Sequence, residues 1–226
     1  MSKYFRITIT HSVLVWGVLL MIIPLWLIFA SSTHSNSIIY NEGMQWKVGG
    51  ELINNYDRVL NKTGGFTKEI TASKIILNSF IMAFGIATVK VIISAMSAYA
   101  IVYFRFKLAT PIFWLIFITL LVPLEVRILP SYQIVSDLNL TNSYAGLILP
   151  LSASAIETFF FRQYFRSVPD ELLEAAKLDG ANSWKFFVDF LLPLSKTMIA
   201  AMFIFMFVYG YSQYLWPLIM LSLIHI

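Results

Sequence analysis

The stretch ELLEAAKLDGANSWKFFVDFLLPL, residues 171–194, decides how this chain is organised, because it is a charged, glycine-broken segment between long apolar runs. Just before it, Ser167 and the Pro-Asp-Glu sequence that begins at Pro169 are typical of a helix N-terminus. There a hydroxyl caps the backbone and acidic groups meet the positive end of the helix dipole. Gly180 predicts the end of that helix, since glycine accepts the left-handed conformation of a C-terminal turn.

A second, amphipathic helix is predicted directly after this turn. Asn182 or Ser183 is suited to begin it, and Pro193 is suited to end it. Five apolar side chains recur at spacings of three and four and are expected to share one helix face: Phe186, Phe187, Phe190, Leu191 and Leu194. The two helices then form a compact unit that lies against a membrane and can be presented to a partner.

The composition places the rest of the chain in a membrane. Of its 226 residues, 58% are hydrophobic and 12% are charged, which leaves too few polar side chains to cover a soluble protein. The sixteen Lys and Arg residues are spread over loops, so nucleic acid is not an expected partner. The chain has no cysteine, and His11, His34 and His225 are far apart in sequence. We therefore expect no disulfide, no metal site and no cofactor.

We expect an all-α, polytopic membrane protein with five transmembrane helices, because five apolar stretches approach the roughly 20 residues that cross a bilayer core. Their approximate bounds are 12–30, 75–104, 108–124, 144–161 and 197–223. Together with their loops they are predicted to form a single transmembrane domain, residues 1–226. The first stretch contains Pro24 and is followed by no small-residue cleavage pattern, so we interpret it as a retained span.

The basic residues indicate which loops face the cytoplasm. A cytoplasmic N-terminus places nine Lys and Arg residues inside: Lys3, Arg6, Arg105, Lys107, Arg162, Arg166, Lys177, Lys185 and Lys196. It places six outside, namely Lys47, Arg58, Lys62, Lys68, Lys74 and Arg127, and leaves Lys90 within a span. The positive-inside rule favours this orientation, in which 31–74 is a periplasmic loop and 162–196 is a cytoplasmic loop.

The opening stretch resembles the signature loop of the permease subunits of ATP-binding-cassette (ABC) importers. That signature reads Glu-Ala-Ala, three residues, Gly, nine residues, an apolar residue, one further residue and Leu-Pro. The matching positions here hold Glu174, Ala175, Ala176, Gly180, Phe190, Leu192 and Pro193. The resemblance implies the type I importer permease fold, with a coupling helix that docks on a cytoplasmic ATPase. The coupling residues that it implies are Glu174, Ala175, Ala176, Asp179, Gly180 and Pro193.

The resemblance covers nearly the whole chain and is greatest to the carbohydrate-uptake, maltose-permease-like importers. Within them, the segment PLEVRILP, residues 123–130, resembles permeases for sn-glycerol-3-phosphate, because sugar permeases generally have apolar residues in place of Glu125 and Arg127. Tyr211-Ser212 departs from the Trp-Asn that is usual in related permeases. These permeases usually carry a sixth span beyond LWPL, residues 215–218, so we expect the sequence to be a fragment or a frameshifted product.

Four residues are candidates for a substrate pathway: Lys90, Arg127, Tyr209 and Gln213. An ammonium midway along a span costs at least about 2.5 kcal/mol, so Lys90 must face a cavity or a partner. It either attracts a substrate phosphate or forms a structural pair with a carbonyl or with a neighbouring permease. Arg127 offers a planar fork for a phosphate or a carboxylate. Alternatively, Arg127 and Glu125 neutralise each other on a loop or contact the binding protein.

Two further groups allow more than one interpretation. The cluster of Tyr209, Tyr211, Tyr214 and Trp216 either lines a path for polyol substrates or forms an interfacial belt. Glu157 is expected near the cytoplasmic end of the fourth span, as an interfacial charge within helical reach of Arg162.

These observations favour a permease subunit of a binding-protein-dependent importer, multi-pass in a bacterial inner membrane and with sn-glycerol-3-phosphate as substrate. The resemblance implies a second permease as heterodimer partner, two ATPase subunits, a periplasmic binding protein and membrane lipid. The sequence has no G-x-x-x-x-G-K-[ST] loop, so the energy must come from a partner.

Other interpretations remain. A neutral sugar or oligosaccharide is the alternative substrate. A polytopic membrane enzyme would depend on Glu125, Arg127 and Asp137, which include no nucleophile with its base. A passive channel or a scaffold has no use for the Glu-Ala-Ala loop.

Overall fold

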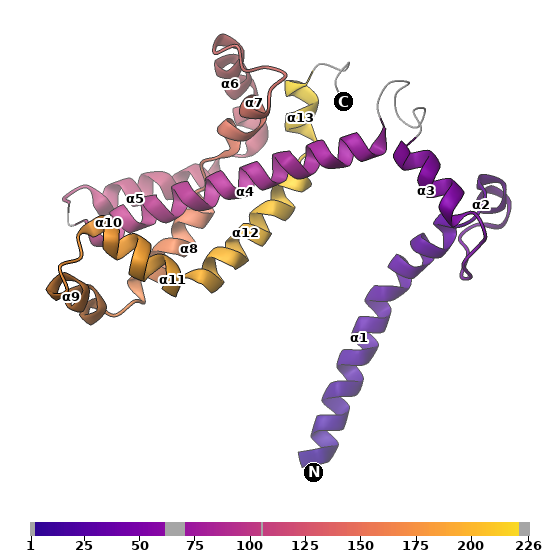
Figure 1. The fold of residues 1–226 in the computed structure, drawn as a ribbon, viewed down its shortest axis with the longest axis horizontal. Helices are drawn as coiled ribbons and strands as arrows, with labels where there is room; N and C mark the ends of the chain where they lie inside the picture. Colours follow the sequence, from indigo (N-terminus) through magenta and orange to yellow (C-terminus); the bar gives the residue numbers. More distant parts are fainter. Residues whose placement is uncertain (1–2, 62–70, 105, 222–226) are drawn as a thin grey trace. The chain divides into compact units, whose positions relative to one another are not determined.

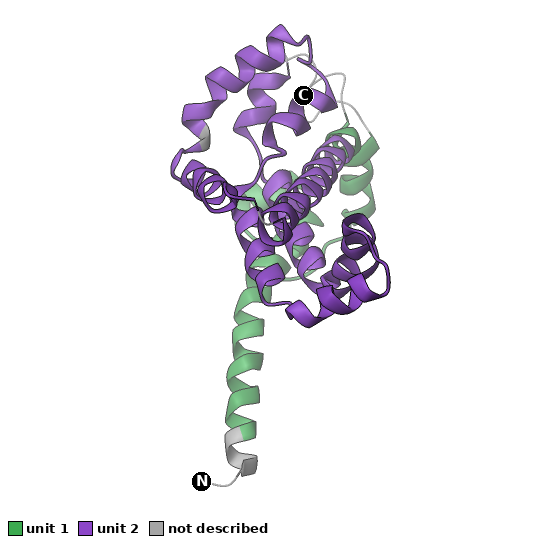
Figure 2. Cartoon of the chain, turned by 90° about the vertical axis from the view of Figure 1, so that its left-hand side faces the viewer, with its two compact units in different colours: residues 1–75 green, residues 76–226 purple. Residues whose placement is uncertain are grey.

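The structure, a computed structural model, describes residues 3–61, 71–104 and 106–221, except for the side chains of 3–6 and 124. Every regular element in these residues is a helix. The chain divides into two compact units, residues 1–75 and 76–226, which Figure 2 distinguishes by colour. Some positions interpreted above lie outside the described residues: Lys62, Lys68, Arg105, His225 and the end of the last predicted span, 222–223.

The first unit contains one long apolar helix followed by a polar loop. Helix α1, Lys3–Ser32, covers the first predicted span and continues through Pro24. Two short helices lie in the loop, α2 (Asn36–Glu42) and α3 (Leu52–Asn61). Asn55 ties α3 to the end of α1, because its Nδ2 donates to the carbonyl oxygens of Ser32 and His34 at 2.9 and 2.8 Å. The polar loop thus folds onto the last turn of α1 through hydrogen bonds.

The second unit is built along α4, Ala72–Tyr103, an unbroken helix of 32 residues (Figure 1). The elements that follow up to α8 are α5 (Ala109–Ile118), η1 (Thr119–Leu121), α6 (Leu124–Asp137), α7 (Tyr144–Ile148), η2 (Leu149–Leu151) and α8 (Ala155–Arg166). The remaining elements are α9 (Asp170–Leu178), α10 (Ser183–Lys185), η3 (Phe186–Leu191), α11 (Leu192–Leu194), α12 (Lys196–Tyr211) and α13 (Leu215–Met220). Of the η elements, η1 and η2 are 3-10 helices and η3 is a π-helix.

Several predicted spans are broken in the structure. The stretch 144–161 is divided between α7–η2 and α8, which meet at 53°, and α8 continues to Arg166. The last stretch breaks after Tyr211, and α13 follows as a separate short helix. Within the described residues two helices are long and apolar enough to cross a membrane, or up to five if each bent pair is one span. Hydropathy alone did not reveal these breaks, because it does not register where a Ser or Pro interrupts the backbone hydrogen bonds.

Two apolar clusters pack along different parts of α4. One contains Met82 and Ile86 with side chains from α6, α7, η2 and α13, including Trp216, which is 1% exposed. The other contains Tyr99 with buried side chains from α8, α9 and η3. At the first cluster α4 and α12 approach closely, since a Cβ at Gly210 would lie 3.1 Å from Cα of Ala83. Small residues are typical of such helix contacts in membranes.

Gly146 in α7 provides a test of how closely α7 packs against the connection from α6. A Cβ built at Gly146 would collide with the backbone carbonyl oxygen of Leu140, which cannot move without displacing the α6–α7 connection. We expect Gly146→Ala to lower the stability of the protein by about 1–3 kcal/mol, the usual range for overpacking. The thermal unfolding midpoint of the purified protein measures this. Gly17→Ala is the matched control, because its Cβ would meet no atom within 4 Å. Equal midpoints for the two variants would contradict the packing described here.

Candidate functional site

Residues 169–195, called the elbow below, fold as two short helical segments around a tight turn. Helix α9 begins at Asp170, with Pro169 at the N-cap position and acidic residues in the first turn, as predicted. The prediction that Ser167 caps α9 is wrong. Ser167 instead ends α8, and its Oγ donates to the carbonyl oxygen of Tyr164 at 2.6 Å. The extended conformation of Pro169 separates Ser167 from α9, which therefore starts without a side-chain cap.

The turn of the elbow is a Schellman motif centred on Gly180. Gly180 has a φ of +78°, which confirms the predicted left-handed residue. The amide of Ala181 donates to the carbonyl oxygen of Ala176 at 2.9 Å, and the amide of Gly180 donates to that of Lys177 at 3.0 Å. Of the two candidates for the next helix start, Asn182 is the cap, because its Oδ1 accepts from the amide of Lys185 at 2.8 Å.

The second segment of the elbow consists of α10, the π-helix η3 and α11. Its predicted apolar face is largely confirmed, because Phe186, Phe187 and Leu191 are buried and Phe190 packs against them. Leu194 departs from the prediction and is 47% exposed. A π-helical turn contains more residues than an α-helical one, so the residues after η3 are rotated away from the face that α-helical spacing predicts.

Aromatic side chains of α4 and α8 contact the elbow and hold it in place. The hydroxyl of Tyr99 on α4 donates to the carbonyl oxygen of Ser183 at 2.7 Å, and the Tyr99 ring lies 4.8 Å from that of Phe187. The ring of Tyr103, one turn further along α4, lies 5.3 Å from Phe186. A displacement of the elbow must therefore move the end of α4 or break these contacts.

Most of the residues that resemble a coupling signature are exposed. The exposed members are Glu174, Ala175, Asp179, Gly180 and Pro193, whereas Ala176 is buried against the cluster at the end of α4. Two large apolar side chains stand beside them in solvent, Leu178 at 89% and Trp184 at 63% exposure. Exposed apolar groups beside an exposed carboxylate are suited to a docking surface.

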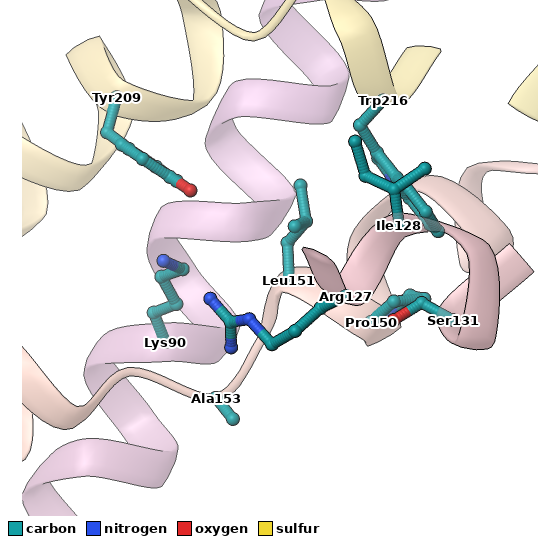
Figure 3. Close-up of a pocket in the computed structure, with 9 residues that line it drawn as sticks. All are labelled: Lys90, Arg127, Ile128, Ser131, Pro150, Leu151, Ala153, Tyr209 and Trp216. Atoms are coloured by element: carbon teal, nitrogen blue, oxygen red, sulfur yellow. The ribbon is translucent and has the colours of Figure 1, made fainter. Parts of the chain in front are cut away.

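A small cavity with two cationic groups lies near the middle of α4, within the second unit. It is lined by Lys90, Arg127, Ile128, Ser131, Pro150, Leu151, Ala153, Tyr209 and Trp216, and its volume is about 50 Å³. Figure 3 shows the nitrogen-bearing ends of Lys90 and Arg127 turned toward each other, with the Tyr209 hydroxyl nearby. We call this site the charged cavity. Among the described residues, no three His, Asp or Glu side chains gather to hold a metal ion.

Lys90 is 6% exposed, and its ammonium group contacts a thioether and an aromatic ring. Its Nζ lies 3.8 Å from Sδ of Met206 and 4.3 Å from the centroid of the Tyr209 ring. A thioether is a weak acceptor, and a cation over an aromatic ring is attracted by about 0.5–2 kcal/mol. These contacts orient the ammonium but do not neutralise it, because neither the thioether nor the ring carries a negative charge.

Arg127 and Glu125 lie on α6, and not on a loop as expected. Residues two apart on a helix do not face each other, so the helix separates their charges and leaves Arg127 directed at the cavity. Gln213, the fourth pathway candidate, does not line the cavity; its Nε2 donates to the carbonyl oxygen of Tyr209 at 3.4 Å. The structure thus brings together three of the four candidates and gives the fourth a backbone contact.

The aromatic cluster predicted around Tyr209 is divided in the structure. Tyr209 faces the charged cavity, and Trp216 is buried with its Nε1 donating to the carbonyl oxygen of Leu147 at 3.1 Å. Tyr211 and Tyr214 are 46% and 74% exposed. The four side chains therefore do not form one cavity lining, and the interfacial belt stays a prediction.

Glu157 was missed as a functional candidate. The expectation that it is an interfacial charge near Arg162 is wrong, because Glu157 is 0% exposed and lies in the first turn of α8. Arg162 instead places its Cζ 4.0 Å from the centroid of the Phe113 ring. The pattern Ser154-x-x-Glu157 is that of a capping box, and this pattern could have located Glu157 at a helix start.

Comparison with known proteins places these features in a family. Residues 81–223 match the family described as "Binding-protein-dependent transport system inner membrane component". The sn-glycerol-3-phosphate transport system permease protein UgpE of Yersinia pestis is 47% identical over 212 residues, which are 94% of this chain and 75% of that protein. The UgpE proteins of Rhizobium meliloti and Escherichia coli K12 are 46% and 44% identical, over 93% and 94% of this chain and 75% of their own lengths.

A solved structure supports the same fold. The crystal structure of a bacterial ABC transporter involved in the import of the acidic polysaccharide alginate contains a chain that superposes with a TM-score of 0.75. The two sequences are 21% identical, and the superposition covers 98% of this chain and 77% of the other. From the family match over residues 81–223 and the relatives that are 44–47% identical over most of the chain, we conclude that the chain belongs to the inner membrane components of binding-protein-dependent transport systems.

Proposed function

We propose that the chain is a permease subunit of an importer for sn-glycerol-3-phosphate. The UgpE proteins, which are 44–47% identical over most of the chain, support this substrate. The observation that carries the proposal is the charged cavity, in which Lys90 and Arg127 converge on one space. Lys90 is buried, so its charge is costly without a partner, and Arg127 reaches the same cavity from an exposed position. A phosphate can accept hydrogen bonds from both groups.

A neutral sugar, the alternative substrate, can accept hydrogen bonds from the two cations but lacks the attraction between opposite charges that a phosphate has. The volume of the charged cavity, about 50 Å³, is far below the roughly 300 Å³ at which ligand pockets begin. The chain therefore supplies one wall of the pathway, and a second permease supplies the opposite wall.

The enzyme alternative has no support, because Glu125 and Asp137 are exposed side chains on α6 without a nucleophile beside them.

The proposed assembly has a second permease as heterodimer partner, two ATPase subunits and a periplasmic binding protein. The N-terminus of the chain and the elbow face the cytoplasm, and the loop 31–74 faces the periplasm. The excess of basic residues on the first set of segments supports this orientation. Its consequence is that the exposed side chains around Glu174 and Leu178 meet the ATPase, while the charged cavity lies within the membrane-embedded bundle.

The proposed cycle uses the elbow as a mechanical joint. Nucleotide-dependent closure of the ATPase subunits displaces α9, and the contacts of Tyr99 with the elbow pass this displacement to α4. Because Lys90 is on α4 and Tyr209 is on α12, a shift of α4 alters the charged cavity. A ligand responds to such a shift only if it binds the two states with different affinity, and a phosphate between two movable cations meets this condition.

Replacement of Gly180 tests the role of the elbow. A left-handed backbone costs a residue with a Cβ roughly 1–2 kcal/mol, so Gly180→Ala weakens the turn and is expected to reduce copurification of the ATPase with the permease by up to about tenfold. Gly180→Asn should be milder, because Asn tolerates this conformation. Gly50→Ala is the control, since its Cβ would meet no atom within 4 Å and its φ is not in the left-handed range. Equal ATPase recovery in all three variants would argue against docking through the elbow.

Replacement of Lys90 tests the pathway. Lys90→Met keeps an unbranched side chain, one atom shorter, and removes its charge. We expect uptake of radiolabelled sn-glycerol-3-phosphate per assembled transporter to fall at least about tenfold, because the phosphate loses a cationic partner. Lys47→Met, at an exposed position in the loop, is the matched control. Near-normal uptake by an assembled Lys90→Met transporter would exclude the pathway role. Competition by unlabelled neutral sugars in the same assay separates the two substrate classes.

A further inference from the structure

Glu157 is a carboxylate that the proposed cycle does not use. It is 0% exposed and stands in the first turn of α8. Its Oε2 accepts a long hydrogen bond, 3.5 Å, from Oγ of Ser94 on α4, and its Oε1 has no hydrogen-bond partner. A buried carboxylate without full compensation is costly, so its presence calls for a cation nearby.

Lys90 is in position to be that cation. Lys90 and Ser94 are four residues apart on α4, so their side chains lie on the same helix face, one turn from each other. Ser94 contacts Glu157, and the charges of Lys90 and Glu157 attract each other through the buried space between α4 and α8. The ammonium itself contacts Met206 and Tyr209.

We propose that Glu157 is the resident counter-charge of Lys90, a positioning residue that balances the ammonium when no anion occupies the charged cavity. The Oε1 atom of Glu157 has no hydrogen-bond partner, so it can accept a hydrogen bond from the Lys90 ammonium. A substrate phosphate then competes with Glu157 for Lys90, and the phosphate is released when the ammonium returns to the carboxylate. The competition with phosphate rests on the proposed function, whereas the charge pair itself does not.

The pair is tested by a double-mutant cycle in the whole transporter, coexpressed with its partner subunits. Lys90→Met leaves Glu157 unbalanced and Glu157→Gln leaves Lys90 unbalanced, so we expect each single variant to accumulate in membranes several-fold less than the wild type. The double variant, in which both charges are removed, should return close to the wild-type level. Glu42→Gln, an exposed carboxylate on α2, is the matched control and should have no effect. A double variant no more abundant than the poorer single variant would overturn the proposal.

Sulfate inhibition provides a second readout that a merely structural pair would not change. Sulfate is a dianion that is not a product of ATP hydrolysis, so it can be added to an assay of binding-protein-stimulated ATPase activity, with chloride at equal ionic strength as reference. We expect the Glu157→Gln transporter to be inhibited at about tenfold lower sulfate concentration, because sulfate no longer competes with the carboxylate. The added sensitivity should disappear in the double variant.

The two readouts distinguish which idea fails. A restored double variant together with unchanged sulfate inhibition in Glu157→Gln would overturn the positioning role, even though the two charges depend on each other. If the pair and the sulfate response are both present but Lys90→Met imports sn-glycerol-3-phosphate normally, the counter-charge is supported and the proposed substrate pathway fails.

Discussion

The contact between the elbow and the end of α4 is the interaction on which the rest of the second unit depends. Tyr99 combines a 2.7 Å hydrogen bond to the backbone of Ser183 with a ring contact to Phe187, and these two interactions fix both the position and the orientation of the elbow. In an apolar bundle, helix association depends on such packing and hydrogen bonds, because lipid offers apolar side chains an equally favourable environment. Loss of this contact would leave the elbow held by the Tyr103–Phe186 ring contact, by its apolar side chains packed near α8, and by the Tyr164 hydroxyl, which donates to the carbonyl oxygen of Leu194.

Helix α4 turns this local contact into a connection between two sites. It has 32 residues without a break, so it is about 48 Å long at 1.5 Å per residue, and it carries Tyr99 and Lys90 on one rigid element. The neighbouring span is broken between η2 and α8. This break places residues of η2 and of the connection to α8 in the lining of the charged cavity. One continuous helix among broken ones is suited to the proposed cycle, in which a displacement of the elbow reaches the cavity and the cavity walls adjust.

The sequence predicts the parts of this arrangement that depend on local chemistry. Gly180 was identified correctly and Asn182 was one of two candidate caps, because a left-handed turn and an N-cap are properties of one or two residues. Leu194 was placed on the wrong side because the π-helical turn changes the helical register, which α-helical spacing cannot anticipate. The surroundings of Glu157 were missed because burial against Ser94 joins segments that are 63 positions apart in the chain. Cap and turn residues therefore predicted most of the elbow. The tertiary contacts around the charged cavity could not be predicted from them, because those contacts join segments far apart in the sequence.

The central claim is that the elbow meets a nucleotide-hydrolysing partner on the cytoplasmic side. The chain has no cysteine, so a single Leu178→Cys substitution places a unique thiol on a side chain that is 89% exposed at the end of α9. In intact membranes that contain the whole transporter, the account predicts that a short thiol cross-linker joins this position to the ATPase subunit and that the yield changes when nucleotide is added. Labelling of the thiol by an impermeant reagent from the periplasmic side, with no cross-link to the ATPase, would contradict it.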